Sequence, residues 1–337
     1  MIISKTPFRM SFFGGGTDLK EFYEEYGGAV ISSTFDKYCY VTVRHLPRFF
    51  DYKNQITYSK IERTKSVDEI EHPLVRNCMK YLDMHELIVT YDADLPARTG
   101  LGTSSSFAVG LLNAFHSLKG KQKDKKTLAD EAIYVERVLC DEAGGLQDQI
   151  AASFGGLNRI DFNKDGYSVK PINISKDRKE ELNNNLLLYF TGFSRFSADI
   201  QTDTKKNISN NTEKLLKMKD MVDEAEDILV NENRDLDDFG RLLNEAWMLK
   251  RSTGNKISTN EINLIYDRAI KAGALGGKLL GAGGGGFVLL YVSKDRQEDV
   301  KKELKDLLLV PFKFEDEGTC LIYDAPEDFE LEEVEND

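Results

Sequence analysis

A glycine- and serine-rich segment, residues 96–106, stands between a run of strand character and a run of helical character. The run before it, residues 87–91, is rich in β-branched and aromatic side chains. After it, apolar residues between 107 and 118 recur at helical spacing. Glycine lets backbone N–H groups approach one point, and the N-terminal end of a helix is electropositive. This order therefore predicts a loop that cradles phosphate groups.

The loop 96–106 is not a Walker A motif, because no Gly-Lys-Ser/Thr follows its glycines. Its hydroxyls at Thr103, Ser104 and Ser105 can cap the following helix, bind a phosphate oxygen or coordinate Mg²⁺. An ordinary helix start with a serine cap is the alternative, although capping alone does not require Gly-x-Gly just upstream. We expect the phosphate groups of a bound ligand to contact Arg98, Gly100, Leu101, Gly102, Thr103, Ser104 and Ser105.

A second glycine run, residues 281–286, has the spacing G-x-G-x-x-G but precedes a strand-like segment, residues 287–292. A dinucleotide-binding fingerprint follows a strand and opens a helix, so the reversed order argues against that function. The run instead predicts a close approach of the backbone to a ligand or to the other half of the protein. A flexible hairpin or bulge is the alternative.

A third glycine motif lies near the start of the chain and ends in Thr17-Asp18. It predicts a tight loop that presents Arg9 and Asp18 to a polar ligand. An aspartate after a glycine turn is, however, commonly a cap or turn residue. On its own, this motif is weak.

Two further carboxylates, Glu136 and Asp148, are candidates for phosphoryl-transfer chemistry. Glu136 flanks the apolar stripe of a helix predicted over residues 128–142, for which Thr127 is the expected cap. Asp148 lies in the glycine-bounded segment 144–156, which predicts a short helix. Such a site needs one carboxylate to position the hydroxyl nucleophile and another oxygen ligand for Mg²⁺. A solvated surface position is the alternative for Glu136.

Composition narrows the class of protein. The formal net charge of −12 argues against a nucleic-acid-binding surface. The four cysteines are far apart and form no C-x-x-C pair, which predicts free thiols rather than zinc or disulfides. No apolar run approaches the about 20 residues that span a bilayer, and the N-terminus lacks the apolar core of a signal peptide. We therefore expect a cytoplasmic enzyme that contacts no membrane.

The polar stretch 175–185 predicts a boundary between two domains. The expected N-terminal domain, residues 1–183, contains the phosphate loop. The expected C-terminal domain, residues 184–337, contains the glycine run 281–286 and an acidic tail. Because both halves mix strand and helix patterns, the fold class is α+β.

The three glycine motifs, in this order, resemble those of the GHMP kinase superfamily. Its pattern P-x-x-x-G-L-G-S-S-A reads P-A-R-T-G-L-G-T-S-S from residue 96, where Thr103 and Ser105 depart from the usual serine and alanine. The resemblance implies a ribosomal protein S5 domain 2-like N-terminal domain and a ferredoxin-like C-terminal domain. It also implies an active site between the two halves, with ATP and Mg²⁺ as cofactors.

Within the superfamily, residues 8–18 and 145–149 resemble most the heptose 7-phosphate kinases, and fucokinases are similar too. The resemblance implies transfer of the γ-phosphoryl of ATP to the anomeric hydroxyl of D-glycero-D-manno-heptose 7-phosphate. The heptose 1,7-bisphosphate formed would serve synthesis of nucleotide-heptoses and surface polysaccharides. A kinase for another sugar such as fucose, and a non-catalytic sugar-sensing homologue, are the alternatives. A homodimer is left open.

The resemblance also implies roles for individual residues. Asp148 would act as general base or orient the attacking hydroxyl, and Arg9 would stabilise the transferring phosphoryl. Ser104 and Glu136 would hold Mg²⁺. The substrate contacts implied are Arg9, Gly15, Gly16, Asp18, Asp148, Gly283 and Gly284. A phosphate on the sugar needs a further cationic site, for which the sequence leaves five candidates open: Arg98, Arg195, Lys250, Arg251 and Lys278.

Overall fold

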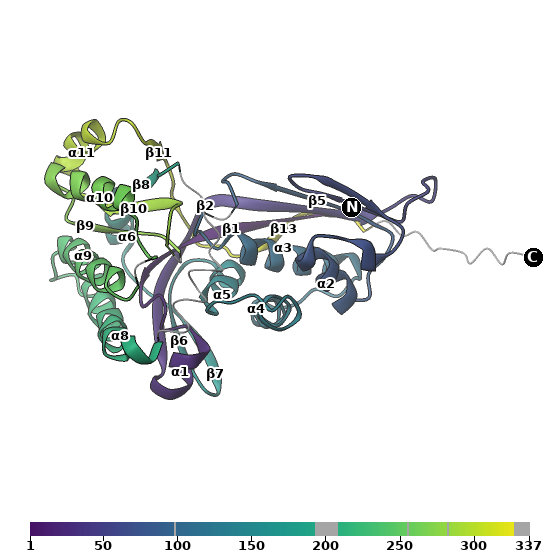
Figure 1. Cartoon of the computed structure of the whole chain (residues 1–337), viewed down its shortest axis with the longest axis horizontal. Coiled ribbons are helices and arrows are strands. Elements are labelled where there is room, and N and C mark those ends of the chain that lie inside the picture. The colour runs from purple at the N-terminus through teal and green to yellow at the C-terminus, as the bar shows by residue number, and fades with distance from the viewer. Residues whose placement is uncertain (98, 193–207, 255, 282, 327–337) are drawn as a thin grey trace, which may run out of the picture.

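The computed structural model describes residues 1–97, 99–192, 208–254, 256–281 and 283–326 (Figure 1). Its helices are α1 (Lys20–Tyr26), α2 (Pro73–Tyr81), α3 (Thr103–Leu118), α4 (Lys125–Tyr134), α5 (Gln147–Phe154), α6 (Lys176–Asn184), α8 (Ile208–Val230), α9 (Asp237–Arg251), α10 (Asn260–Ala272) and α11 (Gln297–Glu303). The strands form two sheets, and helices α2 to α5 lie along one face of the larger sheet (Figure 1).

The larger sheet has nine strands and is built around the 18-residue strand β2. Strand β2 pairs antiparallel with β1 along one edge, over residues 31–43. Along its other edge it pairs antiparallel with β6 at residues 28–33 and with β5 at residues 39–45. The strands of this sheet are β1 (Ile2–Phe13), β2 (Gly28–His45), β3 (Asn54–Thr57), β4 (Ile61–Thr64), β5 (Leu87–Ala93), β6 (Leu157–Asn163), β7 (Gly166–Pro171), β12 (Phe314–Glu315) and β13 (Cys320–Asp324).

The smaller sheet is antiparallel, in the order β11-β8-β10-β9. Numbered along the chain, its strands lie in the order 4-1-3-2, which is the ferredoxin-like arrangement that the family resemblance implies. The two mixed helix-and-sheet halves confirm the expected α+β fold. The strands of this sheet are β8 (Leu186–Phe190), β9 (Gly276–Leu279), β10 (Phe287–Tyr291) and β11 (Leu308–Val310).

The end of the described chain returns to the larger sheet. Strand β13 pairs with β1, and β12 pairs with β2. The expected C-terminal domain, residues 184–337, therefore includes strands that belong to the sheet of the N-terminal half. The domain boundary at residue 183 remains a prediction. It assigns β12 and β13 to the C-terminal domain, although both strands pair with the larger sheet.

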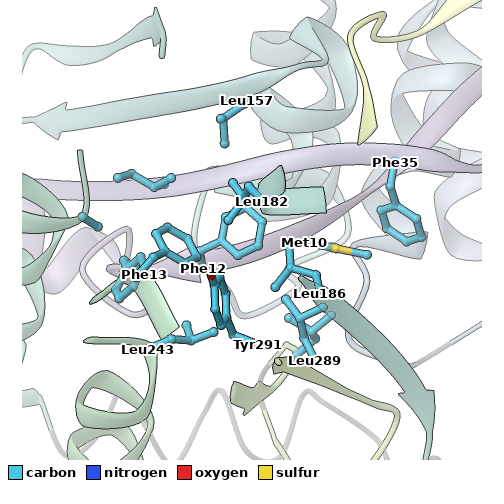
Figure 2. Close-up of a cluster of buried hydrophobic side chains, with 14 of the residues drawn as sticks. Met10, Phe12, Phe13, Phe35, Leu157, Leu182, Leu186, Leu243, Leu289 and Tyr291 are labelled. Atoms are coloured by element: carbon cyan, nitrogen blue, oxygen red, sulfur yellow. The ribbon is translucent and has the colours of Figure 1, made fainter. Parts of the chain in front are cut away.

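Strand β10 has apolar side chains on both faces because it is buried on both. On one face, Leu289 and Tyr291 pack in a cluster that includes Phe12 and Phe13 from β1 (Figure 2). On the other face, Leu290 packs with residues of α9, α10 and α11. The first cluster joins the two sheets and so fixes the end of β1, which carries Arg9 and leads into the first glycine motif.

The start and the cap predicted for the helix over residues 128–142 are wrong. The helix predicted over residues 128–142 begins at Lys125, and its N-cap is Asp124, whose carboxylate accepts a hydrogen bond from the N–H of Thr127. Beyond Tyr134 it continues as a π-helix, Val135–Leu139. The polar stretch 175–185, which the sequence predicts to be a domain boundary, contains the helix α6, capped by Ser175. None of the described helices combines the length and apolarity that crossing a membrane requires.

Candidate active site

The phosphate-loop candidate runs from the end of β5 to the start of α3, as the sequence predicts. Gly100 and Gly102 have φ angles of +82° and +73°, a left-handed conformation that glycine adopts without strain. Gly102 occupies the N-cap of α3, so the cap provides no side-chain hydrogen bond. The serine hydroxyls are therefore not the cap, and the first turn of α3 points its N–H groups toward the loop. Arg98 lies outside the described residues.

Arg9 joins this loop to Asp148. Its Nε donates to Oδ1 of Asp148 and its Nη2 to Oδ2, both at 2.8 Å, while its Nη1 donates to the carbonyl of Gly100 at 2.6 Å. The backbone N–H of Arg9 donates to the carbonyl of Leu101 at 3.1 Å. A Cβ at Gly102 would lie 3.3 Å from Cγ of Arg9 and 3.4 Å from Cγ of Asp148. The loop thus lies directly against the Arg9–Asp148 pair.

Glu136 is buried in the π-helix and contacts the start of α3. Its carboxylate accepts hydrogen bonds from the hydroxyls of Ser104, at 2.8 Å, and Ser105, at 2.7 Å, and from the amide of Gln149. Ser104 is exposed, whereas Thr103 and Ser105 are buried. The structure therefore brings together the two residues expected to hold Mg²⁺, beside the phosphate loop.

Asp18 lies in the first glycine motif and is almost fully buried. Its carboxylate accepts hydrogen bonds from the backbone N–H of Gly16, at 2.9 Å, and of Gln147, at 3.3 Å. A Cβ at Gly145 would lie 1.9 Å from Oδ2 of Asp18, so only glycine fits there. These contacts hold the first glycine motif against the start of α5, where Asp148 is the second residue.

The second glycine run packs against the phosphate loop. A Cβ at Gly281 would lie 2.3 Å from Cα of Gly100, and one at Gly286 would lie 2.1 Å from the carbonyl oxygen of Thr99. The run therefore approaches the other half of the protein, one of the two explanations that its spacing predicts. Gly283 and Gly284 contact the backbone of Ile257 instead.

A pocket, here called the central pocket, lies between the two halves. Four cationic side chains, two carboxylates and several small or polar residues surround it. Its lining residues are Arg9, Ser11, Gly15, Gly16, Asp18, Leu19, Arg137, Gly145, Gln147, Asp148, Lys250, Lys278 and Gly281. Five of the seven expected substrate contacts are among them, while Gly283 and Gly284 are not.

Two of the five cationic candidates, Lys250 and Lys278, reach the central pocket. Nζ of Lys250 donates to the carbonyl of Gly15, and Nζ of Lys278 to that of Phe12, both at 2.9 Å. Burial lowers the pKa of each lysine, and for Lys278 the neighbouring charges of Lys250 and Arg9 lower it further. Arg251 is not part of the lining, and Arg195 lies outside the described residues.

Several lining residues were given no role by sequence reasoning, among them Ser11, Arg137 and Gln147. Arg137 follows Glu136 in the π-helix and donates from Nη2 to the carbonyl of Gly145 at 2.9 Å. Short π-helical turns occur frequently at functional sites, but no residue type in the sequence predicts where one will form. Gln147 could have been found from its position one residue before Asp148.

The carboxyl groups do not form a dedicated metal cage. Within the described ranges, no group of three or more His, Cys, Asp or Glu side chains is arranged so that it could hold a metal ion. Mg²⁺ at kinase sites is held by one or two protein oxygen ligands together with substrate phosphates, and needs no such cage. A buried carboxylate beside an exposed hydroxyl, as at Glu136 and Ser104, fits that requirement.

Comparison with known proteins gives matches in both halves of the chain. Residues 73–156 match the N-terminal domain of GHMP kinases, and residues 225–308 match their C-terminal domain. The D-glycero-alpha-D-manno-heptose 7-phosphate kinase of Campylobacter jejuni is 30% identical over 319 residues, 90% of this chain and 93% of that protein.

Two further similar proteins were found, and this chain covers nearly the whole length of one but less than a quarter of the other. The crystal structure of a D-glycero-D-manno-heptose 1-phosphate kinase from Bacteroides thetaiotaomicron has a TM-score of 0.78 and 26% identity. The match covers 95% of this chain and 98% of that one. The L-fucokinase/L-fucose-1-P guanylyltransferase of Bacteroides fragilis is 31% identical over 224 residues, which are 63% of this chain but 23% of that protein. From the domain matches and the full-length relative, the chain belongs to the GHMP kinase family.

Proposed function

We propose that this protein is an ATP-dependent sugar kinase that phosphorylates the anomeric hydroxyl of D-glycero-D-manno-heptose 7-phosphate. The observation that carries the proposal is the contact of the phosphate loop with the Arg9–Asp148 pair, at the edge of the central pocket. An acceptor in the pocket would have its hydroxyl beside Asp148 and the γ-phosphate of ATP beside Gly102.

Asp148 and Arg9 have complementary roles in this proposal. The acceptor oxygen attacks the γ-phosphorus, the bond to the bridging oxygen of ADP breaks, and the carboxylate of Asp148 orients the hydroxyl and accepts its proton. Arg9 holds that carboxylate at two points and places its positive charge beside the transferring phosphoryl. The N-terminal end of α3 contributes further positive potential to the same phosphates.

Ser104 and Glu136 are the residues proposed to hold Mg²⁺. In kinases, Mg²⁺ bound to the nucleotide neutralises charge that develops on the phosphates. Ser105 and Gln149 donate hydrogen bonds to Glu136 and so keep its carboxylate oriented toward the loop.

The choice of acceptor is supported by the names of two relatives and by the charge of the pocket. The Campylobacter protein is called a heptose 7-phosphate kinase and the Bacteroides thetaiotaomicron protein a heptose 1-phosphate kinase, so both names specify a phosphorylated heptose. Four cations against two carboxylates also favour an anionic acceptor. The fucokinase similarity makes a free sugar the second candidate.

A substrate panel tests the proposal. Release of ADP would be measured with heptose 7-phosphate, heptose 1-phosphate, unphosphorylated heptose, fucose and galactose, each with ATP and Mg²⁺. We expect the highest kcat/KM for heptose 7-phosphate. Turnover of free hexoses without turnover of the heptose phosphate would refute the proposed acceptor, and no turnover of any sugar would favour a non-catalytic homologue.

A further inference from the structure

Three cationic side chains converge on the central pocket in an otherwise acidic protein. Lys250 comes from the end of α9, Lys278 from β9 and Arg137 from the π-helix, so both halves of the chain contribute. The chain as a whole has a net charge of −12. When all six ionisable groups of the lining are charged, however, the pocket has a net charge of about +2.

None of these three cations forms an ion pair with a carboxylate of the described chain. The contacts of Lys250 and Lys278 are with the carbonyls of Gly15 and Phe12, and those of Arg137 are with the carbonyls of Gly145 and Glu142. Asp148 is engaged by Arg9, and Asp18 by two backbone N–H groups. Lys278 is buried, and Lys250 and Arg137 are half-buried. A buried charge without a partner is costly, and such groups are normally paired.

Two polar atoms in the same pocket have no hydrogen-bond partner. The hydroxyl of Ser11 and Oε1 of Gln147 are buried and unsatisfied. Both side chains lie near Lys250, because a Cβ at Gly15 would be 3.5 Å from Nζ of Lys250, 3.6 Å from Oγ of Ser11 and 3.8 Å from Nε2 of Gln147. Unsatisfied polar atoms in a native protein require an explanation, and a ligand is one.

We propose that Lys250, Lys278 and Arg137, together with the hydroxyl of Ser11, bind the phosphate monoester of the acceptor. A phosphate monoester has about two negative charges. This charge would balance that of the lining when all six of its ionisable groups are charged. Arginine offers a planar pair of donors to a phosphate, and each lysine offers a mobile point charge. The proposal rests on the proposed function in one respect, namely that the acceptor is a sugar phosphate.

The position of these cations argues that they serve the acceptor rather than ATP. Among described residues, the lining of the central pocket contains Asp18 and Asp148 but no residue from 99 to 105. The carboxylate Glu136, which contacts the phosphate loop, is not part of it either. A phosphate bound by Lys250 would therefore be on the acceptor side of the Arg9–Asp148 pair.

The test compares phosphorylated and unphosphorylated heptose as acceptors for Lys250→Met and Arg137→Met. The matched control is Arg251→Met, because Arg251 neighbours Lys250 on α9 but is outside the pocket. Loss of a charge-assisted contact should lower kcat/KM for heptose 7-phosphate by about 10- to 100-fold, mainly through KM. The KM for ATP should change little, and any loss with unphosphorylated heptose should be at least about 10-fold smaller than the loss with heptose 7-phosphate. Lys250→Arg should recover most of the loss.

Other outcomes would overturn the proposal in distinct ways. An equal loss for both acceptors would mean that the cations are structural, and a loss expressed in the KM for ATP would assign them to the nucleotide. If the wild type uses no sugar phosphate, the proposed acceptor fails separately. Titration calorimetry with inorganic phosphate then tests the site itself: binding that Lys250→Met weakens and Arg251→Met does not supports it, and no binding to the wild type refutes it.

Discussion

Arg9 and Asp148 form a two-point ion pair, with both nitrogen–oxygen distances at 2.8 Å, across 139 positions of sequence. The side chain of Arg9 is 5% exposed and that of Asp148 is 22% exposed, so the carboxylate is the more accessible partner. Because Arg9 also donates to the carbonyl of Gly100, the pair is joined directly to the phosphate loop. Arg9 therefore holds both Asp148, the proposed base, and the loop that is proposed to bind the phosphates of ATP.

Replacing Asp148 by Asn should remove proton acceptance while keeping the size of the side chain. We expect kcat to fall by about 10²- to 10⁴-fold, the range that general base catalysis contributes. The dissociation constant for ATP, measured by calorimetry, should change little, because the loop N–H groups are untouched. Turnover equal to that of the wild type would remove Asp148 from the mechanism.

Replacing Glu136 by Gln should weaken the response to Mg²⁺. The amide keeps the volume but loses the charge that Ser104, Ser105 and Gln149 surround. We expect the Mg²⁺ concentration for half-maximal activity, at fixed ATP, to rise by at least about 10-fold. Glu142→Gln, an exposed acidic residue nearby, is the control and should titrate like the wild type. An unchanged Mg²⁺ titration of the Glu136 variant would contradict the assignment.

Replacing Gly281 by Ala should damage ATP binding at a distance. Its φ is +82°, and the new Cβ would meet Cα of Gly100 at 2.3 Å, which forces the phosphate loop to shift. Gly120→Ala is a matched control, because its φ is +65° but no atom lies within 4 Å of the new Cβ. Both variants should lose about 1–2 kcal/mol of stability from backbone strain. Only Gly281→Ala should raise the KM for ATP, and equal effects on both would refute the coupling.

The lysines of the central pocket should produce two opposite dependences on pH. In the folded protein the pKa of each lysine lies below the ordinary value of 10.5. At a pH between the lowered pKa and 10.5, the unfolded chain binds more protons than the folded protein, so the free energy of unfolding rises with pH. Over the same pH range Lys250 loses its charge; the charge of Asp18 opposes this loss and that of Arg9 favours it. Because a neutral lysine binds phosphate less well, the KM for heptose 7-phosphate should rise.

The difference between wild type and Lys250→Met isolates this effect from that of other titrating groups. Chemical denaturation and acceptor KM would be measured from pH 7 to 10 for both proteins. The wild type should gain stability relative to the variant and lose acceptor affinity relative to it as the pH rises. Parallel curves for the two proteins would contradict the shifted pKa of Lys250.

Local features of the site could be predicted from the sequence because a few neighbouring residues determine them. The phosphate loop follows from a strand, two glycines and a helix that are adjacent in the chain. The pairing of Ser104 with Glu136 was predicted through family resemblance. At residues 175–185 the sequence indicates only a polar stretch, because helix α6 has no apolar stripe and Leu182 is its buried side chain. The cap of α4 was misplaced because Asp124 and Thr127 are both good N-cap residues.

Long-range features could not be predicted from a single sequence. The return of β12 and β13 to the larger sheet depends on pairing across some 280 to 320 positions. Arg137 reaches the central pocket through a π-helical turn, and no residue pattern encodes that turn reliably. The sequence offers five cationic candidates for the phosphate site. Lys250 and Lys278 line the central pocket and Arg251 does not, and this difference depends on how α9 and β9 pack in three dimensions.

The position of the phosphate in the product tests the central claim most directly. Wild-type protein would be incubated with ATP, Mg²⁺ and heptose 7-phosphate, and the product examined by phosphorus NMR with proton coupling. We predict two sugar phosphate signals, one unchanged at C7 and a new one coupled to the anomeric proton, and no new signal with Asp148→Asn. A new phosphate on any other carbon, or a new signal that persists in the variant, would contradict the proposed reaction.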